Sequence, residues 1–137
     1  MVRKTKAGKL PKMELEGTEY VFMIDPVAKP RMTRKDKWAK RNCVVNYWRY
    51  KGDLISLAKE IDFKLPDVFA VEFYIPFPKS YIGDQKERLL NRPHQMKPDV
   101  DNLLKGLFDA FNIRDQSIHF VLVRKIWAVR GSIRIIV

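Results

Sequence analysis

The residues best suited to chemistry gather in one short stretch of the chain: the aspartates Asp99, Asp101, Asp109 and Asp115, with Lys105 among them. Carboxylate oxygens without histidine or cysteine are the ligands that Mg²⁺ or Mn²⁺ prefers. An ion held there could activate water and stabilise the leaving oxygen of a phosphodiester, while Lys105 stabilises the phosphoryl charge. A structural alternative is that Asp99 and Asp101 cap a helix and that Asp101 forms an ordinary exposed ion pair with Lys105. The segment alone leaves both interpretations open.

A helix that begins after Pro98 and runs to about Asn112 would position these side chains. At 100° per residue, its apolar residues form one continuous face. Asp101, Lys105 and Asp109 share the opposite face because they are four residues apart. Asp115 lies beyond this helix in the chain, so it can lie near Asp99 and Asp101 only if the sheet brings it back to the start of the helix.

A run of cations precedes this helix in the chain. Between Lys29 and Lys51 there are nine basic residues and one acidic residue, and the whole chain has a net charge of +11. Such a surplus indicates a polyanionic partner: nucleic acid first, an acidic membrane surface second. A basic protein without such a partner is the remaining alternative. The candidate phosphate contacts are Lys29, Arg31, Arg34, Lys35 and Lys37. Two tryptophans, Trp38 and Trp48, suit either base stacking or a place in a core or interface.

The hydrophobic patterning predicts one mixed sheet with helices against it, which is the α+β class. Strands are expected over Tyr20–Ile24, Val68–Phe77, Ile118–Val129 and Ile133–Val137. The second, almost wholly apolar, is typical of a central strand covered on both faces. The last two are expected to form a hairpin through Arg130 and Gly131.

Helices besides the acidic one are expected from a cap at Asn46 to about Ile61 and over Tyr81–Leu90 with Ser80 as the cap. We assign residues 1–20 to a flexible basic arm and residues 21–137 to one domain. His94, just before the acidic helix, is expected in a surface loop.

Composition bounds the remaining possibilities. A chain of 137 residues that is 46% hydrophobic and 12% aromatic can build one core without covalent staples, which excludes a disordered protein. We expect no membrane span and no secretory signal, because no sufficiently long apolar run is present. The lone cysteine, Cys43, excludes an intramolecular disulfide and suits a reducing cytoplasm.

The acidic helix resembles the signature of the RusA family of Holliday junction resolvases. The matching residues are Asp99-Val100-Asp101-Asn102-Leu103-Leu104-Lys105, followed by Phe108-Asp109-Ala110-Phe111-Asn112. Three further stretches agree in order and spacing: the basic segment from Pro26 to Arg34, the middle region from Pro78-Lys79-Ser80 to Pro93-His94, and a last motif with Asp115, Gln116 and Lys125. The likeness runs from about Phe22 to Val137, so only the arm lies outside it.

The resemblance implies a RusA-like fold and a homodimeric, Mg²⁺-dependent endonuclease that cuts four-way DNA junctions by paired nicks in recombination and repair. Mn²⁺ is a possible substitute, and no organic cofactor or membrane partner is implied. A two-fold symmetric junction also suits a dimer with two equal sites. By resemblance, Asp99, Asp101 and Asp115 bind the metal and are catalytic, Lys105 is the catalytic lysine, and Asn102 and Asp109 support them by hydrogen bonds or a salt bridge. Members are often encoded by phages and prophages, so the resemblance implies a cytoplasmic protein that is bacterial or phage-encoded.

One stretch departs from the family pattern. Members usually have two adjacent aspartates before a small residue and Gln, whereas this chain has Arg114-Asp115-Gln116-Ser117. Asp115 matches the second acid, which is the one that the family uses. Two alternatives to a junction nuclease stay open: a DNA-binding protein of the same fold without cleavage, and a nuclease for other branched or flapped DNA or for RNA.

Overall fold

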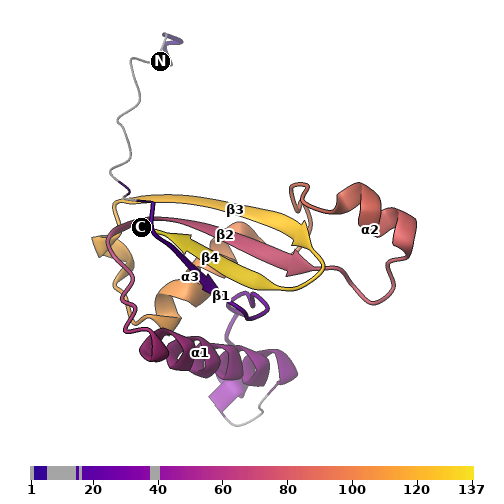
Figure 1. The fold of residues 1–137 in the computed structure, drawn as a ribbon. Coiled ribbons are helices and arrows are strands. Elements are labelled where there is room, and N and C mark those ends of the chain that lie inside the picture. The colour runs from indigo at the N-terminus through magenta and orange to yellow at the C-terminus, as the bar shows by residue number, and fades with distance from the viewer. Residues whose placement is uncertain (1, 6–14, 16, 38–40) are drawn as a thin grey trace.

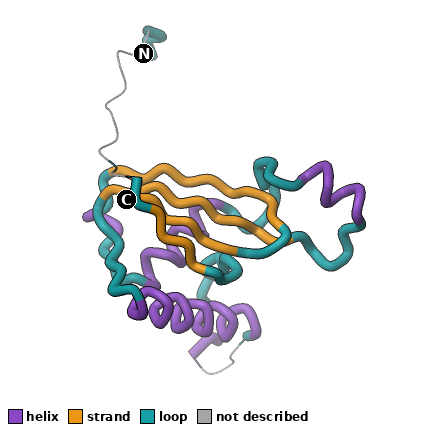
Figure 2. Tube along the Cα trace, viewed as in Figure 1, coloured by secondary structure: helices purple, strands orange, loops and turns teal. Residues whose placement is uncertain are grey.

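The computed structural model describes residues 2–5, 15, 17–37 and 41–137, and of Asp36, Lys37 and Asp115 it describes the backbone alone. The described strands form one mixed four-stranded sheet in the order β1-β4-β2-β3 (Figures 1 and 2). β2 is parallel to β3 and antiparallel to β4, and β4 is antiparallel to β1. The strands are β1 (Glu19–Phe22), β2 (Val68–Pro76), β3 (Phe120–Ala128) and β4 (Ser132–Ile136). The predicted α+β class with a mixed sheet is confirmed.

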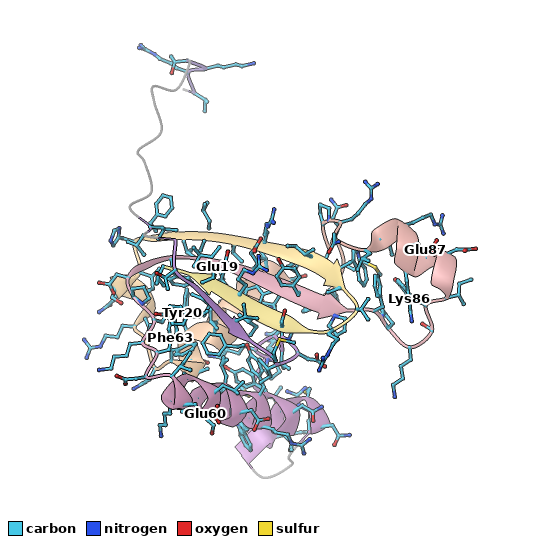
Figure 3. All side chains as sticks on the ribbon, viewed as in Figure 1. Glu19, Tyr20, Glu60, Phe63, Lys86 and Glu87 are labelled. Carbon is cyan, nitrogen blue, oxygen red and sulfur yellow. The ribbon has the colours of Figure 1, made fainter. Side chains whose placement is uncertain are left out.

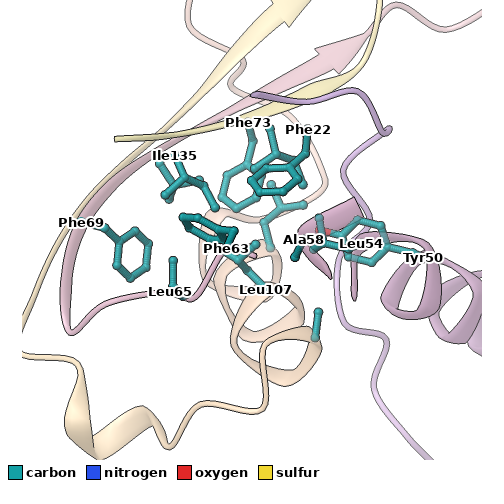
Figure 4. Packing of buried hydrophobic residues seen from close by; sticks show 14 of the residues in the cluster. Phe22, Tyr50, Leu54, Ala58, Phe63, Leu65, Phe69, Phe73, Leu107 and Ile135 are labelled. Carbon is teal, nitrogen blue, oxygen red and sulfur yellow. The ribbon is translucent and has the colours of Figure 1, made fainter. Parts of the chain in front are cut away.

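The helices α1 (Asn42–Glu60) and α3 (Val100–Ala110) lie on one side of the sheet, and α2 (Gly83–Leu89) lies beyond its end (Figure 1). The core fills the space between sheet and helices, where Phe73 and Ile135 from the strands pack with Leu54 of α1 and Leu107 of α3 (Figure 4). The rings of Tyr20 and Phe63, with centroids 4.7 Å apart, extend this core past the end of α1 (Figure 3). No helix within the described ranges combines the length and apolarity needed to cross a membrane.

The predicted C-terminal hairpin is wrong, because β2 lies between β3 and β4. The connection between these two strands crosses the end of β2, where Pro76 is in register with Ala128. Gly131 in this connection lies so close to Asp25 that a Cβ atom there would be 2.8 Å from the Asp25 Cα. Two apolar runs joined by a turn predict neighbouring strands, and nothing in their patterning shows that a third strand separates them.

β2 is central, as predicted, but the described helices cover only one of its faces. Phe69, Val71 and Phe73 point into the core, whereas Glu72 lies on the opposite face among charged neighbours. There it pairs with Arg124 of β3 and, at 3.5 Å, with Arg134 of β4. The expectation of a strand covered on both faces is therefore wrong. On the face that the described helices leave uncovered, Glu72 is flanked by two arginines of the neighbouring strands.

Both helices that precede the acidic one start at other residues than predicted. α1 begins four residues before Asn46, because Val44 is fully buried and belongs to the packed face of the helix. α2 begins at Gly83, and the expected serine before it is not the cap. The Tyr81 ring instead packs against Trp127, with centroids 5.6 Å apart, which keeps this residue outside the helix.

The segment between α2 and α3 covers the outer edge of β3. Pro93 forms an isolated bridge with Ile126, and the amide of His94 donates to the carbonyl of Lys125 at 2.9 Å. This pairing draws the His94 ring inward, to a centroid distance of 4.2 Å from Trp127, and leaves the residue 5% exposed. The expectation of a surface histidine is wrong, because the contact joins segments far apart in the sequence.

Candidate active site

α3 presents two faces of opposite character, as its sequence predicts. Leu103 and Leu107 are fully buried and fix the helix on the core, whereas Asp101 and Lys105 are exposed. Apolar burial of this kind stabilises by about 1.5–3 kcal/mol for each large side chain. Packing therefore decides which way the polar residues of α3 face.

Asp99 and Asp101 mark the N-terminal end of α3. Asp99 is the residue before the first helical one, with extended backbone, and its side chain forms no capping hydrogen bond. Among the described side chains, Asp101 and Lys105 form no ion pair with each other or with a neighbour. Both carboxylates are thus exposed at a helix N-terminus, where the dipole favours negative charge. Within the described part of the chain, Asp99 makes no capping hydrogen bond and Asp101 makes no ion pair with Lys105.

Lys125 of β3 fixes the segment that leads into α3. Its ammonium donates to the carbonyl oxygens of Met96 at 2.6 Å and of Pro98 at 2.7 Å. Hydrogen bonds from a charged donor are stronger than neutral ones. The position of Asp99, which follows Pro98, is therefore tied to the sheet by a lysine 26 residues further along the chain.

The start of the cationic run lies directly on α3. The amide of Lys29 donates to the carbonyl of Asn102 at 3.0 Å. This approach needs Gly106, because a Cβ atom there would be 3.1 Å from the carbonyl oxygen of Val27 and 3.4 Å from the Tyr47 ring. A glycine inside a helix is otherwise unfavourable, so its role here is to admit the neighbouring backbone.

A groove of about 660 Å³ runs between these two parts of the chain. Lys29, Pro30, Arg31 and Met32 line one side, and Asn102, Lys105 and Asp109 of α3 line the other. Its walls therefore combine the predicted phosphate-binding segment with the predicted catalytic lysine. The exposed cations Arg31 and Lys105 in its walls suit the phosphates of a nucleic acid backbone.

Asp109, which lines this groove, is half-buried. Its Oδ2 atom accepts a hydrogen bond from the Tyr47 hydroxyl at 2.7 Å and pairs with the Lys29 ammonium at 2.8 Å. Burial by itself would raise the pKa of Asp109, but the hydrogen bonds from Lys29 and Tyr47 outweigh it and lower this pKa. Burial first, and then the hydrogen bond to Asp109, raises the pKa of Tyr47. Asp109 is therefore an anion held by two partners, Tyr47 and Lys29.

The candidate phosphate contacts differ in their surroundings. Lys29 pairs with Asp109, whereas Arg31, Arg34 and Lys35 are exposed. Lys37 belongs to the short 3-10 helix η1 (Arg34–Lys37), and its side chain lies outside the described residues. Trp38 lies outside them as well, and Trp48 on α1 is 46% exposed. Exposed cations beside the groove are available to a polyanion without breaking an internal contact.

Asp115 belongs to the short 3-10 helix η2 (Asp115–Ser117), which follows the C-terminal end of α3. Its side chain lies outside the described residues, so the predicted meeting with Asp99 and Asp101 stays a prediction. Among side chains that are described, no group of three or more His, Cys, Asp or Glu converges to hold a metal ion. The two exposed carboxylates at the start of α3 supply oxygen ligands alone, which suit a hard cation that keeps several waters.

Sequence reasoning missed three residues of this site. Tyr47 lies in an amphipathic helix and is a core residue, and nothing in its local pattern shows that its hydroxyl donates to Asp109. Arg41 donates to the carbonyl of Arg31 at 2.8 Å and ties the cationic segment to the start of α1. Gly106 carried a usable signal, because a glycine in the interior of a strongly amphipathic helix indicates a close backbone contact.

The fold and the groove define a basic α+β protein in which a cationic cleft lies against an acidic helix, an arrangement suited to nucleic acid. The sequence profile of the family described as Endodeoxyribonuclease RusA matches residues 23–137. The chain therefore belongs to the RusA endodeoxyribonuclease family, a family of Holliday junction resolvases, and the resemblance found in the sequence is confirmed. A comparison with curated proteins yields no match.

Proposed function

We propose that this protein is a Mg²⁺-dependent endonuclease that resolves four-way DNA junctions by paired nicks, in recombination and repair in a bacterial cytoplasm. The observation that carries the proposal is the groove of about 660 Å³ that Arg31 and Lys105 both line, beside the helix whose N-terminal end carries Asp99 and Asp101. Family membership supports the class of reaction. The residues of this groove support the site.

Each part of the site has a separate task. Arg31 and its neighbours bind the DNA backbone and bring a phosphate to a surface whose aspartates would otherwise repel it. Lys105 approaches the same phosphate from α3 and stabilises the charge that develops on its oxygens. Asp99 and Asp101, with Asp115 as the third ligand, would hold the ion. A bound Mg²⁺ supplies Lewis-acid polarisation of the phosphate and a water of lowered pKa.

We further propose that the active form is a homodimer. A four-way junction has two-fold symmetry, so a symmetric dimer presents two equal sites to opposed strands. The C-terminal run does not offer a bare edge for this contact, because β4 lies between β1 and β2 and its Ile133 and Ile135 are fully buried.

The test is a labelled synthetic four-way junction incubated with the protein in Mg²⁺, in Ca²⁺ and in EDTA. The proposal predicts symmetric nicks in Mg²⁺ alone, and loss of nicking with retained junction binding in Asp101→Asn. Lys59→Met, on an exposed position of α1 away from the groove, is the matched control and should cut normally. Binding without any nick in Mg²⁺ or Mn²⁺ would mean that the chain, with Arg114 in place of the usual acid, binds but does not cut. Cutting of flaps with an intact junction would assign another branched substrate.

A further inference from the structure

We propose that Tyr47 and Asp109 are positioning residues that hold Lys29, and with it the segment Lys29–Met32, in place over Lys105. We call the contacts among Tyr47, Asp109 and Lys29 the latch. The inference rests on the proposed function, because it concerns how the groove is kept ready for a DNA phosphate. It assigns to α1, which lines none of the groove, a role in the reaction.

The latch joins three distant parts of the chain at one oxygen atom. Oδ2 of Asp109 is 2.7 Å from the hydroxyl of Tyr47, 62 residues away, and 2.8 Å from the ammonium of Lys29. Tyr47 is 1% exposed, so its hydroxyl cannot turn to bulk water when Asp109 is lost. A buried donor without an acceptor is costly, which makes the Tyr47–Asp109 contact the firm side of the latch.

Lys29 is held at its backbone as well as at its side chain. Its amide donates to the carbonyl of Asn102 at 3.0 Å, and Gly106 leaves the space that this contact needs. Asn102 and Asp109 are seven residues apart on α3 and both line the groove, so they hold the two ends of Lys29 along one helix face. Two attachments define both the place and the direction of the segment that follows.

The charges show why Lys29 positions more than it attracts. Its ammonium is paired with Asp109 and thereby adds little to the net field, whereas the Arg31 side chain is exposed and carries its full charge. Lys51 lies over the Tyr47 ring at 5.4 Å from the centroid, which adds a second cation on the α1 side of the latch. Removal of the Tyr47 hydroxyl therefore changes the placement of the groove wall and leaves the number of exposed cations unchanged.

The test compares Tyr47→Phe with Tyr50→Phe. Both tyrosines are buried in α1, but the Tyr50 hydroxyl has no hydrogen-bond partner in the described structure, so its removal is a matched control. Single-turnover cleavage of a saturating four-way junction should fall about tenfold in Tyr47→Phe, since a misplaced groove wall impairs orientation more than binding. Junction affinity should change less than threefold, and Tyr50→Phe should match the wild type. Equal rates in the two variants would overturn the proposal.

A double-mutant cycle tests whether Tyr47 acts through Lys29. Lys29→Met removes the ammonium and keeps the aliphatic stem, and the double variant should be no slower than Lys29→Met alone. Additive losses would show that Tyr47 acts by another route and would overturn the latch. If Tyr47→Phe does not fold, Asp109→Asn takes its place in the same cycle.

Amide exchange separates this inference from the proposed function, because it needs no cleavage. The Lys29 amide should lose protection against hydrogen exchange in Tyr47→Phe and keep it in Tyr50→Phe. Protection that is equal in both variants would overturn the latch even if the wild type cuts junctions. If the wild type cuts nothing, the nuclease proposal is refuted, and with it the role of the latch in a reaction. If Tyr47→Phe still exposes the Lys29 amide in that case, the latch holds Lys29 in place without a part in cleavage.

Discussion

Lys125 of β3 donates to the carbonyl of Pro98 at 2.7 Å, so the sheet holds the residue next to Asp99 directly. Lys125→Met removes this donor and keeps the stem. We expect junction cleavage to fall about tenfold, because the start of α3 is no longer fixed relative to Lys105. We also expect a loss of about 1.5–3 kcal/mol in the free energy of unfolding by urea, which is typical of hydrogen bonds to charged groups. Lys79→Met, in an exposed loop, is the control; equal cleavage by both variants would contradict this role.

Two helical glycines of this protein should respond oppositely to alanine. Nothing lies within 4 Å of a Cβ atom built at Gly52 on α1, so Gly52→Ala should stabilise the fold by about 0.5–1 kcal/mol. At Gly106 the same methyl group would be 3.1 Å from the carbonyl of Val27. Gly106→Ala should therefore lose that gain, push the cationic segment off α3 and slow cleavage. Urea unfolding and single-turnover rates of the two variants give the comparison, and an equal gain in both would contradict the close contact.

The exposed arginines in the groove wall and just beyond it in the chain, Arg31 and Arg34, should determine the salt dependence of binding. Each phosphate contact contributes about 0.9 to the slope of log affinity against log salt, so Arg31→Ala with Arg34→Ala should lower this slope by about 1.8. The control pair is Lys86→Ala with Arg88→Ala, two exposed residues of α2, the helix that lies beyond the end of the sheet (Figure 1). The slopes of both variant pairs can be measured by fluorescence anisotropy of a labelled junction between about 50 and 200 mM salt, where the affinity of DNA-binding proteins changes strongly. An equal change in slope for the two pairs would place the DNA elsewhere on the protein.

How much of this site was predictable follows from which contacts are local. The amphipathic pattern of α3 determines that Asp101 and Lys105 face outward, because that depends on spacing within one helix. The partners of Asp109 could not be found this way, since Tyr47 and Lys29 come from other segments and meet it only in the packed fold. Local periodicity predicts faces; it does not predict which faces meet.

The sheet shows the same division. The existence of all four described strands was predicted from apolar runs, with ends displaced by a few residues. Their order was not, because β3 and β4 follow each other in sequence and are separated by β2 in space. The sequence around Gly131 is typical of a hairpin turn. The structure differs from a hairpin there, because Gly131 lies against Asp25, a residue far away in the sequence.

His94 should make stability depend on pH near neutrality. Burial under Trp127, and then the charge of Lys125, lower the pKa of His94 in the fold below its ordinary value of 6.5. The unfolded chain therefore binds the proton more readily than the folded protein, so stability rises with pH in this range. The contribution is full above pH 6.5 and is lost as pH falls through the lower folded-state pKa.

His94→Gln removes this titration, so its urea midpoint should vary less than that of the wild type as pH falls from about 7.5 to 5. His119→Gln, at an exposed position, is the control and should follow the wild type. Parallel curves for His94→Gln and the wild type would show that another group causes the pH dependence.

The two ends of α3 allow a test of how the proposed metal site is completed. Asp99 and Asp101 lie at its N-terminal end, Asp115 follows its C-terminal end, and 11 residues at 1.5 Å each extend over about 16 Å. We expect a dimer partner to supply Asp115, because α3 sets its two ends this far apart and only four residues lie between its last residue, Ala110, and Asp115. Asp101→Asn and Asp115→Asn would each inactivate both sites of a homodimer. A mixed dimer of the two would then retain one site with all three aspartates.

Co-expression of the two variants with different affinity tags yields that mixed dimer in pure form. It should nick one strand of a junction per binding event, whereas each parent dimer should nick none. A mixed dimer of Asp101→Asn with Asp99→Asn is the matched control, because both changes affect the same end of α3 and no intact site can form. Activity restored in the first mixture and absent in the control requires ligands from two chains. An inactive first mixture would require Asp115 to reach the other end of α3 within its own chain.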